Sequence, residues 1–187
     1  EIVFGDWSSD VCSSDLETEI KDNLEIIISN LSKYYSKIET LEVDNDILDI
    51  INKIKGITPD ICFNLVESIN GISSLESNFA GLLELLELKF TGNGLLTLAA
   101  CIDKIITKQI LISNDIPTPY YAVKKLNEQL PNNINLNYPL IIKPAYEDAG
   151  IGISEKSIVN NNIELKEQIK YVSSIYKIGR ASCRERV

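Results

Sequence analysis

Histidine and methionine are absent from this chain of 187 residues, and tryptophan occurs only once. Without histidine the chain can form neither a Ser-His-Asp triad nor the mixed Cys/His ligand sets of zinc sites. Of its four cysteines, only Cys62 and Cys101 lie away from the ends, each alone in an apolar run, which is the usual setting of a buried free thiol. No apolar run approaches the roughly 20 residues that span a bilayer. A globular cytoplasmic protein without a membrane partner fits these absences best.

Positive charge is also scarce. The chain has 27 acidic residues against 18 basic ones, a formal net charge of −9, and lysine supplies nearly all of its cations. A nucleic-acid-binding surface needs a basic face, so we expect no nucleic-acid partner. Local basic pockets remain compatible with this balance.

The two ends differ in character from the rest of the chain. Residues 1–16 and 178–187 resemble translated short-read sequencing adapters, and they contain Trp7 and all three arginines. We therefore interpret both ends as adapter-derived, exclude them from fold prediction, and expect them to pack against nothing specific. With no methionine as a natural start, we expect the remaining residues to be a fragment of a longer protein.

Strand and helix patterns alternate in the first half of the chain. Apolar residues at helical spacing predict helices over 25–35, 47–56, 77–88, 95–102 and 103–113. Asp46 is suited to cap the second of these helices and Gly56 to end it. Short apolar runs predict neighbouring strands over 38–43 and 61–66, with a shorter strand at 90–91. This alternation predicts an α/β unit with a parallel sheet, whose first strand would precede Glu17 and be missing.

The pattern changes after the Pro-rich segment at 116–119. Strands are predicted over 120–123, 138–145 and near 157–159, and an amphipathic helix over 164–176. A strand, a glycine turn and a second strand indicate a hairpin in a mixed sheet. We place a domain boundary near Ile102, which gives domains 17–102 and 103–177.

Four features could carry chemistry. Lys143 ends an apolar run that should be buried on both faces, so it either meets a phosphate or reaches solvent from the end of its strand. The glycines at 150 and 152 would let backbone N–H groups approach a ligand, although an ordinary hairpin turn has the same pattern. Lys104 begins a helix, where its ammonium group could bind an anion or reach solvent. Glu67 and Ser68 follow a buried parallel strand, at the position where α/β sheets place ligand-binding groups. An ordinary loop is the alternative interpretation.

Five segments in order resemble the D-alanine–D-alanine ligases and their ATP-grasp relatives. They are Phe63–Leu65, Leu82–Gly92, Asp103–Lys104 with Lys108, Ile116–Pro119 and Tyr138–Ala145. The resemblance implies a Rossmann-like pre-ATP-grasp domain, lacking its first strand, followed by the N-terminal part of an ATP-grasp domain. It also implies a ligase that joins a carboxylate to an amine through an acyl phosphate, with release of ADP and phosphate. The substrates would be small amino acids or peptides, and the assembly a possible homodimer.

The resemblance also assigns roles to residues. It implies ATP binding by two lysines and a phosphate-covering hairpin, namely Lys104, Lys143, Glu147, Asp148, Ala149, Gly150, Ile151 and Gly152. It implies substrate binding by Glu67 and Ser68. Magnesium ligands of the family are expected downstream of the fragment, so we assign no metal ligand and no catalytic residue, and we expect the fragment itself to be inactive.

Two departures from the family pattern bear on specificity. Where the ligases carry His-Gly, this chain has Glu67 and Ser68, and where their phosphate loop reads Glu-Gly-Ser-Ser, it reads Glu147 to Gly150 as Glu-Asp-Ala-Gly. These changes favour a ligase-related ATP-grasp enzyme with another substrate. A D-alanine–D-alanine ligase proper and a nucleotide-binding relative without ligase activity are the alternatives.

Overall fold

The computed structural model describes residues 2–5, 14–44, 46–125, 136–147, 150, 152–175 and 180–185. The chain divides into two compact units, Glu1–Leu98 and Ala99–Val187. The division falls inside helix α4 (Leu95–Ile102), shortly before the boundary predicted near Ile102. We describe each unit by itself.

The first unit contains a three-stranded parallel sheet. Its strands are β1 (Ile2–Gly5), β2 (Glu39–Glu42) and β3 (Cys62–Leu65), in the order β2-β1-β3. The predicted strands and their parallel direction are confirmed. The prediction that β2 and β3 are neighbours is wrong, because β1 lies between them, as the first strand does in doubly wound sheets with the order 2-1-3.

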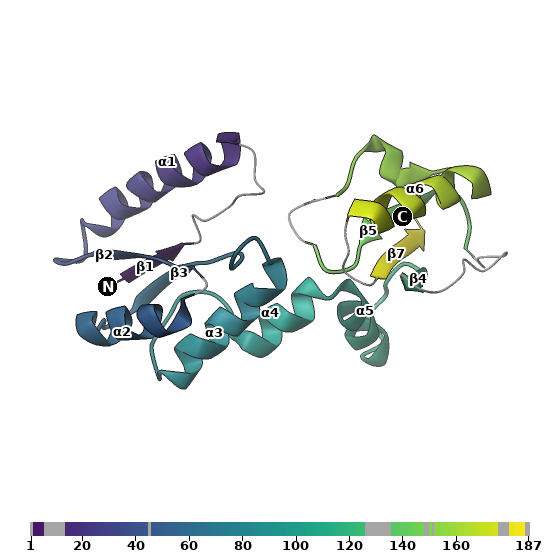
Figure 1. Ribbon diagram of the computed structural model, residues 1–187. Coiled ribbons are helices and arrows are strands. Elements are labelled where there is room, and N and C mark those ends of the chain that lie inside the picture. The colour runs from purple at the N-terminus through teal and green to yellow at the C-terminus, as the bar shows by residue number, and fades with distance from the viewer. Residues whose placement is uncertain are drawn as a thin grey trace. The chain divides into compact units, whose positions relative to one another are not determined.

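Helices cover both faces of this sheet. Figure 1 shows α1 (Ser14–Leu31) on one side of the sheet and α2 (Ile47–Ile57) and α3 (Glu76–Leu85) on the other, as successive crossovers in opposite directions require. A short 3₁₀ helix, η1 (Ser73–Leu75), precedes α3. All the predicted helices exist. Helix α4 has the predicted bounds and the other ends differ by at most four residues, except that α1 begins well before the predicted start.

The ends of α2 test two predictions about capping. Asp46 is the N-cap as predicted, since its side chain accepts a hydrogen bond of 3.1 Å from the N–H of Asp49. Gly56, however, does not end the helix. The helix continues to Ile57, and Thr58 adopts the left-handed conformation (φ 48°) while its N–H donates to the carbonyl of Ile54.

The core of the first unit lies between the sheet and the helices α2 and α3. Its buried members come from β2, α2, β3, the following loop and α3, and they are Leu41, Val43, Ile50, Ile54, Cys62, Val66, Ile69, Phe79 and Leu83. The short strand predicted at 90–91 is a single parallel bridge between Cys62 and Phe90. These contacts fix the loop after β3, which carries the predicted substrate residues.

The second unit contains a four-stranded sheet in the order β4-β7-β5-β6. Its strands are β4 (Tyr121–Lys125), β5 (Leu140–Pro144), β6 (Ile158–Val159) and β7 (Arg180–Glu185). The predicted hairpin of β5 and β6 is confirmed, but every pairing in this sheet is antiparallel, so the expected mixed sheet is wrong. As predicted, β4 and β5 belong to a different sheet from β2 and β3.

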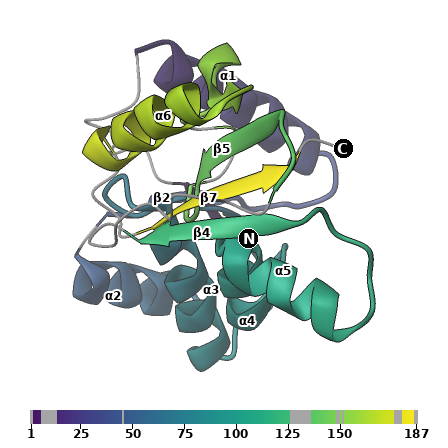
Figure 2. The same cartoon turned by 90° about the vertical axis from the view of Figure 1, so that its right-hand side faces the viewer.

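Two helices flank this sheet. Helix α6 (Asn162–Ile175) packs on β5 and β6, and Figure 2 shows it across one face of the sheet with α5 (Lys104–Ser113) on the other side. The 3₁₀ helix η2 (Glu155–Ser157) leads into β6. The buried cluster under α6 consists of Leu140, Ile142, Val159, Leu165, Ile169 and Val172.

The ends of the chain are paired, contrary to expectation. Strand β1 bonds to β2 and β3, and β7 bonds to β4 and β5, so the prediction that both ends pack against nothing is wrong for residues 2–5 and 180–185. Strand pairing uses backbone N–H and C=O groups, so a segment of any origin can fill a position with partners on both sides. The adapter interpretation of these ends stays a prediction, and Trp7 lies outside the described residues.

Among the residues that the structure describes, no helix is long and apolar enough to cross a membrane.

Candidate functional site

The start of helix α5 is fixed by an aspartate cap. The Asp103 carboxylate accepts hydrogen bonds from the N–H groups of Ile105 at 2.8 Å and Ile106 at 3.2 Å, and Asp103 is only 7% exposed. Such a cap satisfies donors that a helix N-terminus otherwise leaves unpaired. Asp103 therefore fixes Lys104 as the first residue of α5.

Lys104 links the start of α5 to the segment that follows β5. Its backbone N–H donates to the carbonyl of Ala145 at 3.1 Å, and its Nζ donates to the carbonyl of Glu147. The Glu147 carbonyl oxygen offsets part of the repulsion between the Lys104 ammonium group and the positive end of the helix dipole. The structure thus brings together two residues that the resemblance assigns to ATP, Lys104 and Glu147.

Lys143 lies on the less buried face of β5. Burial alternates along this strand, with Leu140 and Ile142 fully buried and Lys143 half-buried. The expectation that the run is buried on both faces is therefore wrong: one face packs under α6, and the face with Lys143 is only partly covered. A half-buried lysine fits either a phosphate contact or an ammonium group in solvent, so the ATP-binding role of Lys143 stays a prediction.

The glycine turn follows β5. Gly150 and Gly152 both have left-handed backbone angles, with φ of 80° and 74°. A Cβ on Gly150 would meet no atom within 4 Å, so its conformation, not the space around it, favours glycine. The Gly150 carbonyl accepts a 3.0 Å hydrogen bond from the Ile153 N–H. The predicted site residues Asp148, Ala149 and Ile151 lie outside the described residues.

The predicted substrate residues lie in the first unit. Glu67 is exposed and Ser68 is half-buried, just beyond the carboxyl end of β3. The turn that follows has positive φ at Asn70 (54°) and Gly71 (69°), and it is closed by two hydrogen bonds between Ile69 and Ile72. The edge at the carboxyl ends of parallel strands is where α/β sheets bind ligands. The role of Glu67 and Ser68 stays a prediction.

No protein-family profile matches the chain. The chain does match curated relatives that are named D-alanine–D-alanine ligase. That of Wolbachia sp. subsp. Drosophila simulans is 33% identical over 133 residues, covering 71% of this chain and 40% of the relative. That of Polynucleobacter asymbioticus is 44% identical over 91 residues, covering 47% and 26%. That of Pseudomonas putida, named D-alanine–D-alanine ligase B, is 32% identical over 168 residues, covering 87% and 50%.

Solved structures of D-alanine–D-alanine ligases share the fold of this chain. The crystal structure of the Bacillus anthracis D-alanine–D-alanine ligase has a TM-score of 0.77 at 23% identity, and it covers the whole chain and 56% of that ligase. A structure of the same ligase complexed with ATP has a TM-score of 0.72 at 24% identity. The chain is D-alanine–D-alanine ligase-like. It spans half or less of the length of the curated ligases cited above.

Sequence prediction gave no role to one buried cation of this ligase-like chain. Lys108, one turn after Lys104 on α5, is only 9% exposed. Its Nζ donates to Thr118 Oγ1 at 2.8 Å and to the Pro119 carbonyl at 2.6 Å, and it lies 5.0 Å from the centre of the Tyr121 ring. The spacing of Lys104 and Lys108 by four residues, which puts both on one helix face, is the signal that could have drawn attention to it.

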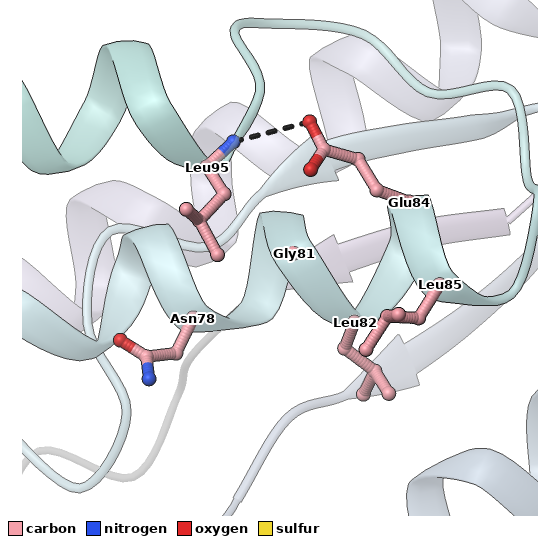
Figure 3. A pocket seen from close by; sticks show the side chains of 6 residues that line it. All are labelled: Asn78, Gly81, Leu82, Glu84, Leu85 and Leu95. Atoms are coloured by element: carbon pink, nitrogen blue, oxygen red, sulfur yellow. Dashed lines mark hydrogen bonds between the residues drawn. The ribbon is translucent and has the colours of Figure 1, made fainter.

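Two cavities of the ligase-like chain lie away from the predicted site residues. One, of about 580 Å³, is lined by α3 and the first residue of α4, and Figure 3 shows Glu84 reaching from α3 to the N–H of Leu95. That hydrogen bond is 3.2 Å long, and a Cβ on Gly81 would overlap the Leu95 side chain, so the two helices approach closely. The other, of about 460 Å³, is lined by Ser154, Lys156, Ile158, Glu164, Glu167, Gln168 and Tyr171.

The two internal cysteines differ in burial. Cys62 is fully buried, as predicted, but Cys101 is exposed on α4, so the expectation of burial is wrong for Cys101. Burial raises the pKa of the Cys62 thiol to about 11, which keeps it protonated and unreactive near neutral pH. Within the described residues, no group of three or more His, Cys, Asp or Glu side chains could hold a metal ion.

Proposed function

We propose that the complete protein is an ATP-dependent, ADP-forming carboxylate–amine ligase of the ATP-grasp type. In this proposal residues 17–102 belong to a pre-ATP-grasp α/β domain and 103–177 to the N-terminal part of an ATP-grasp domain. The observation that carries it is the junction of α5 with the end of β5, where Lys104 contacts the segment between Lys143 and the glycine turn. Curated relatives named as ligases support the same activity.

Each residue of this junction has a defined part in the proposal. The ammonium groups of Lys104 and Lys143 would bind the phosphates of ATP, where two positive charges offset the negative charge of a transferring phosphoryl group. Gly150 and Gly152, with their left-handed backbone, would let N–H groups approach those phosphates closely. Glu147, Asp148, Ala149 and Ile151 would complete the covering turn.

The substrate would be a small amino acid or peptide. Glu67 is exposed beyond β3, and a carboxylate there would attract an ammonium group and repel a carboxylate. Ser68 would add a hydroxyl as donor or acceptor. A homodimeric assembly and a cytoplasmic location belong to the same proposal.

A second candidate is a D-alanine–D-alanine ligase proper, and the names of the relatives favour it. The departures at Glu67, Ser68 and the turn after β5 favour a different substrate. A nucleotide-binding protein without ligase activity is the third candidate. We assign no described residue to magnesium, because no suitable cluster of ligands occurs among them. Magnesium ligands are proposed to lie in other parts of the complete protein.

The experiment is steady-state kinetics of the complete protein, with release of phosphate from ATP as the readout. Lys143→Ala should raise the KM for ATP or lower kcat by roughly tenfold or more, because one charged donor to a phosphate is lost. The matched control is Lys156→Ala, which removes an exposed lysine of the same unit.

Two outcomes count against the proposal. If Lys143→Ala and Lys156→Ala both retain wild-type kinetics, Lys143 is a lysine that reaches solvent from its strand. If the unaltered protein releases no phosphate with any amino acid or peptide while it still binds ATP, the third candidate replaces the ligase.

A further inference from the structure

Helix α5 is held at two successive turns by hydrogen bonds to other segments of the chain. At its start, the Lys104 N–H donates to the Ala145 carbonyl after β5. One turn later, Lys108 donates to Thr118 and Pro119, in the segment that leads into β4. The helix therefore bridges the two segments, and Lys108 is the bridge on the β4 side.

The Lys108 contacts are costly to form, which makes a specific arrangement necessary. Burying an ammonium group is unfavourable unless hydrogen bonds replace its water. Thr118 Oγ1 and the Pro119 carbonyl supply two of them, and the face of Tyr121 adds attraction to the cation. These partners fix the distance of α5 from the chain at 118–121, since both bonds are short and one acceptor is backbone.

A direct contact between Lys108 and a ligand does not fit these distances. Its Nζ lies within 2.8 Å of two protein oxygens and its side chain is almost fully covered, so no face is presented to a phosphate. Lys104, in contrast, is only half-buried at the helix start. Lys108 can therefore act only through the position of the helix.

We propose that Lys108 is a positioning residue, which holds α5 against the 118–121 segment so that Lys104 is presented beside the end of β5. This inference rests on the proposed role of Lys104 in binding ATP phosphates. Shifting the helix by a fraction of a turn would move the Lys104 ammonium away from that site, and small misplacements of binding groups are costly in phosphoryl transfer.

A first experiment needs no activity and uses the 187-residue chain. Hydrogen exchange of the Lys104 amide, followed by NMR, reports the bond to Ala145. In Lys108→Met we expect this amide to exchange roughly tenfold faster, because the charged hydrogen bonds of Lys108 to Thr118 and Pro119 are lost one turn away. The Leu165 amide of α6, which donates to Asn161 at 3.0 Å, should be unchanged.

The two amides separate positioning from general stability. Equal acceleration of the Lys104 and Leu165 amides would mean that Lys108 serves stability alone, and no acceleration at either would overturn the inference as well. If Lys108→Met does not fold, Thr118→Val removes one partner and leaves the lysine in place. It should give the same selective effect at Lys104, and its absence would again overturn the inference.

A second experiment uses the complete enzyme. Lys108→Met should raise the KM for ATP by roughly 10-fold with a smaller change in the KM of the second substrate, whereas exposed Lys156→Met should change neither. In a Lys104→Met background, Lys108→Met should add little, because residues that act through one another are not additive. Full additivity would overturn the inference. Absence of activity in the unaltered enzyme would instead reject the proposed function and leave the exchange experiment as the test of Lys108.

Discussion

At the scale of single residues, surroundings decide what each cation can do. Lys108 is enclosed by Thr118, Pro119 and Tyr121, and its ammonium group binds protein atoms. Lys104 and Lys143 are half-buried, so part of each side chain remains accessible. The same residue type thus has a structural role at one position and a proposed ligand-binding role at the other two.

The cysteines allow a direct test of burial. Desolvation raises the pKa of Cys62 from 9.0 to about 11, whereas Cys101 is exposed on α4. At pH 8 only roughly a thousandth of the Cys62 thiol would be the reactive thiolate, and reagent has no access to it. We expect iodoacetamide to alkylate Cys101 in the folded chain and to spare Cys62, as measured by peptide mass spectrometry.

Denatured chain is the control, in which both cysteines should react. Comparable labelling of the two in the folded chain would contradict the burial of Cys62.

The raised pKa of Cys62 also makes the free energy of unfolding depend on pH. Because Cys62 keeps its proton more tightly when folded, its contribution to the free energy of unfolding is present below pH 9 and is lost as the pH rises toward 11.

At the scale of elements, α5 determines where Lys104 lies. Asp103 caps its first turn, and the Thr107 hydroxyl donates to the Ala100 carbonyl at 2.5 Å, which ties it to the end of α4. Its N-terminus contacts the segment after β5 through Lys104. A helix secured in this way presents its first residue in one orientation, which is what a phosphate-binding lysine requires.

The cap of α5 can be tested by substitution. Asp103→Ala removes the acceptor of the Ile105 and Ile106 N–H groups, and it should lower the free energy of unfolding by about 1 kcal/mol, within a range of roughly 0.5–2 kcal/mol. Asp103→Asn keeps a side-chain oxygen and should cost much less. Urea denaturation followed by circular dichroism measures both. Equal losses for the two variants would show that the charge of Asp103, not its cap, provides the stability.

At the scale of the whole molecule, the proposed activity needs more than either unit. The predicted substrate residues Glu67 and Ser68 belong to the first unit, and the predicted ATP-binding residues to the second. The curated ligases that the chain resembles are matched over only half or less of their own length. Substrate specificity is therefore a property to be measured on the complete protein.

We expect the complete protein to prefer a substrate other than two D-alanines. A carboxylate at Glu67 changes the charge that faces an incoming amino acid, and a site built to pair one polar substrate discriminates strongly against analogues that leave its groups unpaired. Phosphate release from ATP with a panel of D- and L-amino acids and dipeptides measures this preference. The highest kcat/KM for D-alanine alone would make the departures neutral and establish the second candidate.

Local chemistry made much of this structure predictable. The cap at Asp46, the helix over Leu95–Ile102 and the strand at Cys62–Leu65 depend on side chains near in sequence, and all were expected. The junction of Lys104 with Glu147 followed only in part, because the resemblance assigned both to ATP without indicating their direct contact. The Lys108 cluster was not predicted, because its partners lie ten or more residues away along the chain.

The sequence by itself determined the alternation of helices and strands, the N-cap of α2, and the resemblance to ATP-grasp ligases, because periodicity, capping and motif order are written in neighbouring residues. Only the tertiary structure decided that β1 lies between β2 and β3, and that β7 lies between β4 and β5. Strand order depends on backbone hydrogen bonds between distant segments, and those bonds do not specify side chains. The half-burial of Lys143 and the enclosure of Lys108 were also decided by the tertiary structure, because they depend on packing against residues distant in the sequence.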